Sequence, residues 1–187
     1  VGTSEEEELR GTWSETVRTR LPWLVLNLLT ATLGASVVWF FLDTVDRLAV
    51  LAALAPIIAA LGGNAGTQAL AVTVRRLSLA GDGEIGASPY VAVGKELLVG
   101  LVNGAVLGGI VAVFSLFLPD GNPMLGLVVL LAMWGNLIVA GFAGSFIPTF
   151  LNRLGVDPAV ASSVFVHAFT DLIGFFLLLG LATAILL

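Results

Sequence analysis

Five apolar stretches, each long enough to cross a lipid bilayer, dominate this 187-residue sequence. A hydrocarbon core of about 30 Å needs about 20 helical residues. Because lipid offers no hydrogen bonds, a spanning segment must satisfy its own backbone polar groups, and a helix does so. We therefore predict an all-α membrane protein with five transmembrane helices, at residues 21–42, 48–74, 91–118, 124–150 and 159–187.

The composition agrees with this class and excludes several others. Only 11% of the residues are charged and 58% are hydrophobic, whereas a soluble domain carries about 25% charged residues. The sequence has no cysteine, so it has no disulfide or thiolate metal site. The few basic residues are dispersed, which argues against a nucleic-acid partner. We expect a multi-pass protein of the cell membrane, surrounded by the lipid bilayer.

The distribution of arginine and lysine predicts the orientation. Residues 1–20 are polar and acidic, and we expect them to form a cytosolic N-terminal stub or connecting helix before a five-helix transmembrane domain at 21–187. If the spans alternate, seven of the eight basic residues fall on one side and only Arg47 on the other. Since basic segments stay in the cytosol, the N-terminus is predicted to be cytosolic and the C-terminus outside.

Asp171 is the most informative residue within the predicted spans. It lies twelve residues past the start of the fifth span, or about 18 Å deep at 1.5 Å per residue. A carboxylate at that depth costs several kcal/mol unless it meets water, a cation or a partner. No arginine or lysine occurs at matching depth in another predicted span. The sequence therefore favours a cation site over a buried ion pair.

Two polar residues precede Asp171 on the same helical face. Ser163 and His167 lie eight and four residues before it, a spacing that places all three side chains in one stripe. Gly174 is expected to continue this stripe without a side chain. Aligned polar groups with little bulk are typical of a water-filled pathway. His167 has two open interpretations, as a cation ligand or as a buried histidine that bonds a neighbouring carbonyl.

The second span contains an unusual run of glycines. Gly62, Gly63 and Gly66 should weaken the helix, and Asn64 adds an amide oxygen among them. Irregular backbone at membrane depth is tolerated only inside protein or beside a cavity. Freed carbonyls and amide oxygens are hard ligands that suit Mg²⁺. The candidate metal residues are therefore Asp171, Asn64, His167, Ser163 and Gly63.

Several segments resemble the membrane domain of the MgtE family of magnesium channels and its eukaryotic solute-carrier relatives. From about Leu21 onwards the chain carries, in order, PIIAALGGNAGTQAL, GKELLVGLVNG, GNLIVAGFAGSFIP, RLGVDPA and FTDLIGFFLLLGLA. The resemblance implies a homodimer in which the second and fifth helices of both copies surround the pore. It also implies that Asp171 binds a hydrated cation there, and that Mg²⁺ is the bound and transported ion.

The same residues also allow functions other than a magnesium channel. An ion-coupled exporter or carrier would need a second titratable group in the membrane, and His167 is the candidate. Because imidazole favours transition metals over Mg²⁺, His167 also allows a transporter that prefers Zn²⁺ or Co²⁺. An intramembrane aspartyl protease needs two carboxylates that share a proton, and the chain offers no second acid at the depth of Asp171. We therefore do not expect an enzyme.

Overall fold

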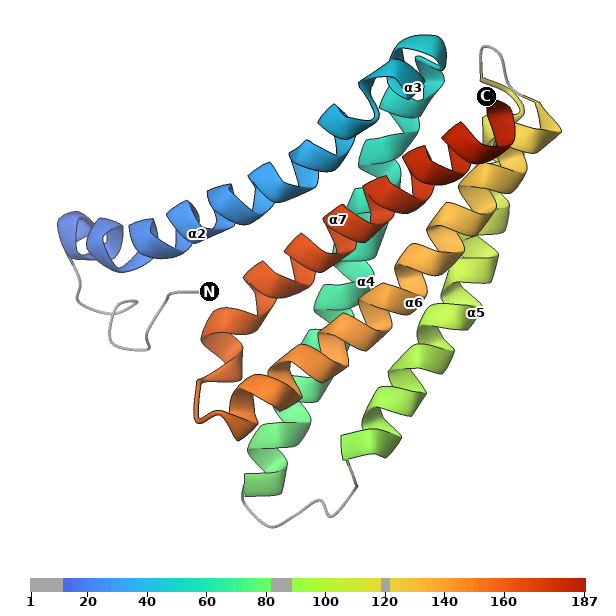
Figure 1. Ribbon diagram of the computed structural model, residues 1–187. Helices are drawn as coiled ribbons and strands as arrows, with labels where there is room; N and C mark the ends of the chain where they lie inside the picture. The colour runs from blue at the N-terminus through green and yellow to red at the C-terminus, as the bar shows by residue number, and fades with distance from the viewer. Residues whose placement is uncertain (1–11, 82–88, 119–121) are drawn as a thin grey trace.

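The computed structural model describes residues 12–81, 89–118 and 122–187, and every regular element among them is a helix (Figure 1). The elements are α2 (Trp13–Phe40), α3 (Leu42–Arg47), α4 (Val50–Gly81), α5 (Pro89–Ser115), α6 (Pro123–Arg153) and α7 (Pro158–Leu186). Five of these helices, all except the short α3, are long and apolar enough to cross a membrane. The prediction of five spanning helices is confirmed.

Most helix boundaries lie within three residues of the predicted spans, and the largest differences are in three places. The first helix begins at Trp13 rather than at residue 21, because the backbone N–H of Thr12 donates to the carboxylate of Glu15 (2.9 Å) and caps a polar first turn. Residues 43–47, expected to be a connection, belong to α3. The second span continues to Gly81, well beyond its expected end at residue 74.

The predicted interruption of the second span is wrong, since α4 is a continuous helix through all of its glycines. Neighbouring side chains occupy the space that the glycines leave. A Cβ built on Gly66 would lie 2.5 Å from Cγ1 of Val166 on α7, so the two helices approach closely there. Close packing of this kind compensates for the low helix propensity of glycine. The backbone is therefore not freed for ion binding in the way that the sequence suggested.

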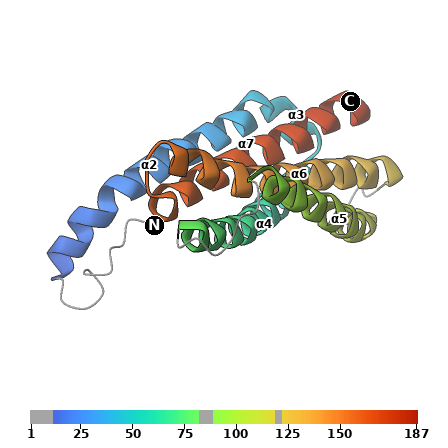
Figure 2. The same ribbon diagram turned by 90° about the horizontal axis from the view of Figure 1, so that it is seen from below.

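Helix α6 is the centre of the bundle, in contact with α4, α5 and α7, and the view in Figure 2 shows it between them. Its Asn136 side chain is fully buried and donates a hydrogen bond from Nδ2 to the carbonyl oxygen of Ile58 on α4 (3.0 Å). Gly174 of α7 faces this amide, because a Cβ there would lie 2.7 Å from Nδ2 of Asn136. The prediction that Gly174 continues the Asp171 stripe is therefore wrong.

Helix α2 packs against α7 near its C-terminal end and diverges from it towards its N-terminal end. Near the C-terminal ends, Phe41 packs edge-on against Phe176 with ring centroids 6.1 Å apart. The hydroxyl groups of Thr44 and Thr183 share a hydrogen bond of 2.7 Å. Towards the N-terminus α2 swings away from the other helices, as Figures 1 and 2 both show. This divergence opens a cavity between α2 and α7.

Candidate cation site

The cavity between α2 and α7 has a volume of about 520 Å³ and contains the polar stripe of the fifth span. Ser163, His167 and Asp171 all line it from α7. The prediction that these three side chains share a face agrees with their common position in the cavity. The opposite wall belongs to α2, and its lining residues are Arg20, Trp23, Leu24, Asn27 and Ala31.

Asp171 lies midway along α7, where α2 and α7 come together. A Cβ built on Gly34 of α2 would lie 3.5 Å from Cβ of Asp171, so the two helices are in van der Waals contact at this level. The carboxylate is partly exposed and lines the cavity. Among the residues that the structure describes, it makes no hydrogen bond or ion pair.

His167 is oriented by its own helix. Its Nδ1 lies 2.9 Å from the carbonyl oxygen of Ser163, and because a carbonyl oxygen only accepts, Nδ1 carries the proton and donates. In the neutral ring Nε2 then keeps its lone pair. A metal-binding histidine is commonly held in this way, with its second nitrogen donating to a carbonyl. The structure thus gives His167 the carbonyl bond of the second interpretation, although its side chain is exposed rather than buried, and leaves Nε2 able to meet a cation.

The two candidates on α4 occupy different positions. Gly63 is buried against the imidazole, since a Cβ there would lie 3.0 Å from Cδ2 and 3.2 Å from Nε2 of His167. Its carbonyl oxygen accepts a hydrogen bond from the hydroxyl of Thr67 (2.8 Å). Asn64 has an exposed side chain and does not line the cavity. Within one chain, Gly63 therefore contacts His167, whereas Asn64 lies outside the cavity that Asp171 lines.

Arg20 lines the site although the sequence places it ahead of the first predicted span. In the structure Arg20 lies within α2 and lines the same cavity as Asp171. It precedes Gly34, the neighbour of Asp171, by fourteen residues, which corresponds to about 21 Å along the helix. Arg20 thus stands at the far end of the cavity. The regular spacing of Arg20, Leu24, Asn27 and Ala31 on one helical face could have revealed it.

The cavity presents few groups that could hold a metal ion. Over residues 12–81, 89–118 and 122–187, no three histidine, aspartate or glutamate side chains gather into a cluster. The arrangement offers one carboxylate, one imidazole nitrogen and one hydroxyl along a polar wall. Such a wall can attract a cation and bind its water shell, and further oxygen ligands would have to come from water or another chain.

Comparisons with known proteins agree with this chemistry. Residues 55–181 match the MgtE family, which is described as a divalent cation transporter. The chain is 34% identical over 166 residues to the magnesium transporter MgtE of Bacillus subtilis. It is 39% identical over 154 residues to the protein of that name from Enterococcus faecalis. Its identity to the magnesium transporter MgtE of Thermus thermophilus is 31% over 167 residues.

These alignments cover most of the chain and a smaller part of each relative. They include 88%, 82% and 89% of this chain but only 36%, 33% and 36% of the three relatives. The chain thus spans about a third of the length of the curated relatives that it matches. The matched region includes α5 and α6, most of α4 and α7, and both Asp171 and His167. With its five apolar helices and its family match over residues 55–181, this multi-pass membrane chain belongs to the MgtE family of divalent cation transporters, which are not enzymes.

Proposed function

We propose that this chain carries Mg²⁺ across the membrane through a pore built by two copies, with α4 and α7 of each copy lining it and Asp171 as the central cation site. The observation that carries the proposal is the position of Asp171. Its carboxylate lies midway along a spanning helix, lines a cavity with Ser163 and His167, and has no ion-pair partner among the described residues. A carboxylate in that position favours a cation.

A hydrated ion suits this cavity better than a bare one. Mg²⁺ loses its water shell reluctantly and keeps several waters in most protein sites. The volume of about 520 Å³ leaves room for an ion with its waters beside the polar wall. Asp171 and Ser163 would then bind the ion through these waters. The membrane potential drives entry with about 4.6 kcal/mol for a double charge at 100 mV, twice the single-charge value.

A second copy completes the charge balance. One carboxylate leaves a divalent cation with a net positive charge in a medium of low dielectric constant, which is unfavourable. Two Asp171 carboxylates around a twofold axis would neutralise the ion. The exposed Asn64 side chain on α4 is then available to face the second copy and to contribute an amide oxygen. The close contact of Gly63 with His167 supports α4 and α7 as adjacent walls of one pore.

A preference for a transition metal is the second candidate, and the orientation of His167 supports it. Because Nδ1 donates to the carbonyl oxygen of Ser163, Nε2 has the lone pair that Zn²⁺ or Co²⁺ would bind. Mg²⁺ would make little use of this nitrogen. The two candidates therefore differ in whether imidazole or carboxylate dominates ion selection.

Cation flux into liposomes that contain the purified protein tests both candidates. We expect Mg²⁺ uptake by the natural protein and a reduction of about tenfold or more in Asp171→Asn, which keeps the shape of the side chain and removes its charge. Asp46→Asn is the matched control, because Asp46 is exposed on α3 and lines no cavity described above. Undiminished Mg²⁺ flux in Asp171→Asn would contradict the assignment. Uptake of Zn²⁺ or Co²⁺ in preference to Mg²⁺ would favour the second candidate.

A further inference from the structure

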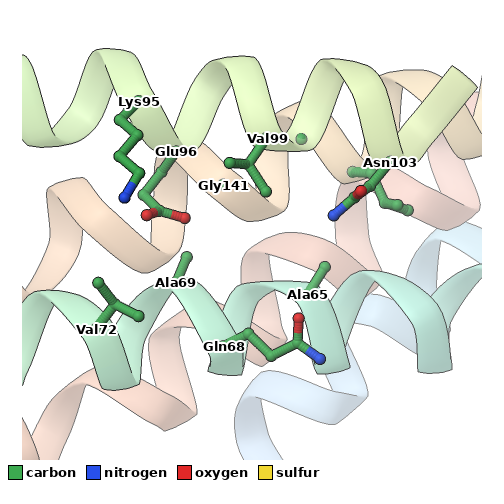
Figure 3. Close-up of a pocket in the computed structure, with 11 residues that line it drawn as sticks. Ala65, Gln68, Ala69, Val72, Lys95, Glu96, Val99, Asn103 and Gly141 are labelled. Atoms are coloured by element: carbon green, nitrogen blue, oxygen red, sulfur yellow. The ribbon is translucent and has the colours of Figure 1, made fainter.

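A second cavity, of about 240 Å³, lies between α4 and α5 with α6 as its floor (Figure 3). Helices α4 and α5 touch each other little, and both pack against α6. Beside the groove, two of the glycines between α5 and α6 bring the two helices into close contact. The backbone of Glu96 packs directly against Gly141 of α6, and the backbone of Leu137 packs directly against Gly100 of α5. This packing draws α5 down onto α6 and leaves a groove beside α4.

Four polar side chains face this groove. Lys95, Glu96 and Asn103 come from α5, and Gln68 comes from α4. In Figure 3 the side chains of Lys95 and Glu96 extend from α5 towards α4. Within the described parts of the chain, none of the four makes a hydrogen bond or an ion pair. Polar groups on a spanning helix are costly unless they find partners, so the groove favours a polar ligand.

The mixture of charges restricts the chemistry of that ligand. Lys95 would repel a bare divalent cation, and Glu96 would repel a simple anion. A zwitterion satisfies both, since its negative group can meet the lysine and its positive group the glutamate. The remaining walls are apolar, with Ala65, Ala69, Val72 and Val99 between the polar groups. A zwitterion attached to a hydrocarbon chain fits both the polar and the apolar parts of the groove.

We propose that this groove binds a phospholipid with a primary ammonium headgroup, of the phosphatidylethanolamine type. Lys95 donates to the phosphate oxygens, and the Glu96 carboxylate accepts an N–H from the lipid ammonium. The amide group of Gln68 hydrogen-bonds to a glycerol ester oxygen, and an acyl chain lies deeper in the groove, against the apolar walls and Asn103. A choline headgroup has no N–H to donate, so Glu96 distinguishes the two zwitterionic lipids.

The depth of these residues agrees with the order of groups in a phospholipid. Lys95 lies six residues after Pro89, the first residue of α5, or about 9 Å from that helix end. This is the end that the arginine and lysine distribution places at the cytosolic surface. Asn103 lies eight residues beyond Lys95, about 12 Å deeper. The charged pair thus faces the headgroup level, and Asn103 lies deeper, at the level of the acyl chains, because the polar layer of a bilayer is only about 5–7 Å thick on each side.

Native mass spectrometry tests the proposal on purified protein incubated with equal amounts of phosphatidylethanolamine, phosphatidylcholine and phosphatidylglycerol that carry identical acyl chains. We expect the ethanolamine lipid to be retained about tenfold more than the choline lipid, the ratio for one charge-assisted hydrogen bond. Glu96→Gln should abolish this preference, and Lys95→Gln should weaken retention of all three lipids. Asp46→Asn and Arg153→Gln remove the same charges from exposed sites outside the groove, and both should behave like the natural protein.

A steric variant separates loss of binding from loss of folding. Val99 is 41% exposed, so Val99→Trp should fold and fill the groove, and it should exclude the lipid with both charged residues intact. Equal retention of the ethanolamine and choline lipids by the natural protein would overturn the proposal. So would an unchanged ethanolamine preference in Glu96→Gln, or preferential retention of phosphatidylglycerol, which would indicate an anion site of Lys95 alone. None of these measurements depends on cation flux, so the proposed transport function is tested separately.

Discussion

Gly63 of α4 lies against the imidazole ring of His167 on α7, and a Cβ at Gly63 would stand 3.0 Å from Cδ2 and 3.2 Å from Nε2. Both distances are shorter than ordinary van der Waals contact. The ring is also held from the other side, because Nδ1 donates to the carbonyl oxygen of Ser163. A side chain at position 63 can therefore be accommodated only if the ring or α4 moves. This contact links the glycine-rich segment to the polar wall of the cavity.

The first prediction follows from this contact. Gly63→Ala should displace the His167 ring and reduce Zn²⁺ and Co²⁺ transport relative to Mg²⁺, since Nε2 leaves its position. Flux of the three ions into liposomes gives the ratio. Gly109→Ala is the matched control, because a Cβ there meets nothing within 4 Å. An unchanged ion ratio in Gly63→Ala would show that His167 does not contribute to ion selection.

The second prediction concerns the junction of α4, α6 and α7. Gly174→Ala would place a methyl group 2.7 Å from Nδ2 of Asn136 and 3.3 Å from Cγ2 of Ile58. The Asn136 side chain would have to move and lose its bond to the Ile58 carbonyl oxygen, at a cost of about 1–3 kcal/mol. We expect a lower melting temperature than in Gly109→Ala. Equal melting temperatures for the two variants would mean that the junction is loosely packed.

The number and nature of the helices could be predicted from sequence, because the apolar stretches are long and lipid permits few alternatives. Ser163, His167 and Asp171 could be assigned to one face because helical spacing fixes it. Their placement along one wall of the cavity agrees with that assignment. These inferences depend on local geometry, which the residues of one helix determine among themselves.

The errors arise where tertiary packing decides the structure. The glycines of α4 suggested a broken helix, but contacts such as that of Gly66 with Val166 stabilise a continuous one. Gly174 was assigned to the Asp171 stripe from its spacing of three residues, yet the position of Asn136 on α6 determines what Gly174 faces. Arg20 was missed because α2 begins earlier than its apolar stretch. No pattern within a single helix could reveal which side chain of another helix packs against each glycine.

The third prediction concerns ligand-linked stability. If Asp171 is the central cation site, Mg²⁺ should raise the melting temperature of the natural protein, because an ion that binds only the folded state stabilises it. Asp171→Ala should keep its fold and lose this response. A concentration series of MgCl₂ against a chelator control measures it. A variant that is still stabilised by Mg²⁺ to the same extent would place the site elsewhere.

The fourth prediction concerns assembly. A single chain offers one Asp171 and one glycine-rich segment with Asn64, so we expect two copies to share each pore. Mass photometry of the protein in nanodiscs should give twice the 19.4 kDa of one chain after subtraction of the disc. Asn64→Ala should lower Mg²⁺ flux without loss of assembly, since it removes only an amide ligand. A single chain per disc that still conducts Mg²⁺ would contradict the dimeric pore.

The last prediction concerns the response of transport to pH. His167 shares its cavity with Asp171 and with Arg20 at the far end. Protonation of the imidazole at acidic pH adds a positive charge beside the path of an entering cation and removes the Nε2 lone pair. Flux should therefore fall as the pH is lowered, and transition-metal flux should fall more steeply than Mg²⁺ flux because it loses a ligand as well. His167→Ala should flatten the difference between the two kinds of ion, and His167→Gln, which keeps a polar side chain without the titration, should do the same. Proton titration of Asp171 would lower the flux of both ions in every variant, so the steeper fall for Zn²⁺ or Co²⁺ is the measurement that belongs to His167. If the two ions keep the same relative pH profiles in the natural protein and in His167→Ala, the imidazole has only a packing role against Gly63.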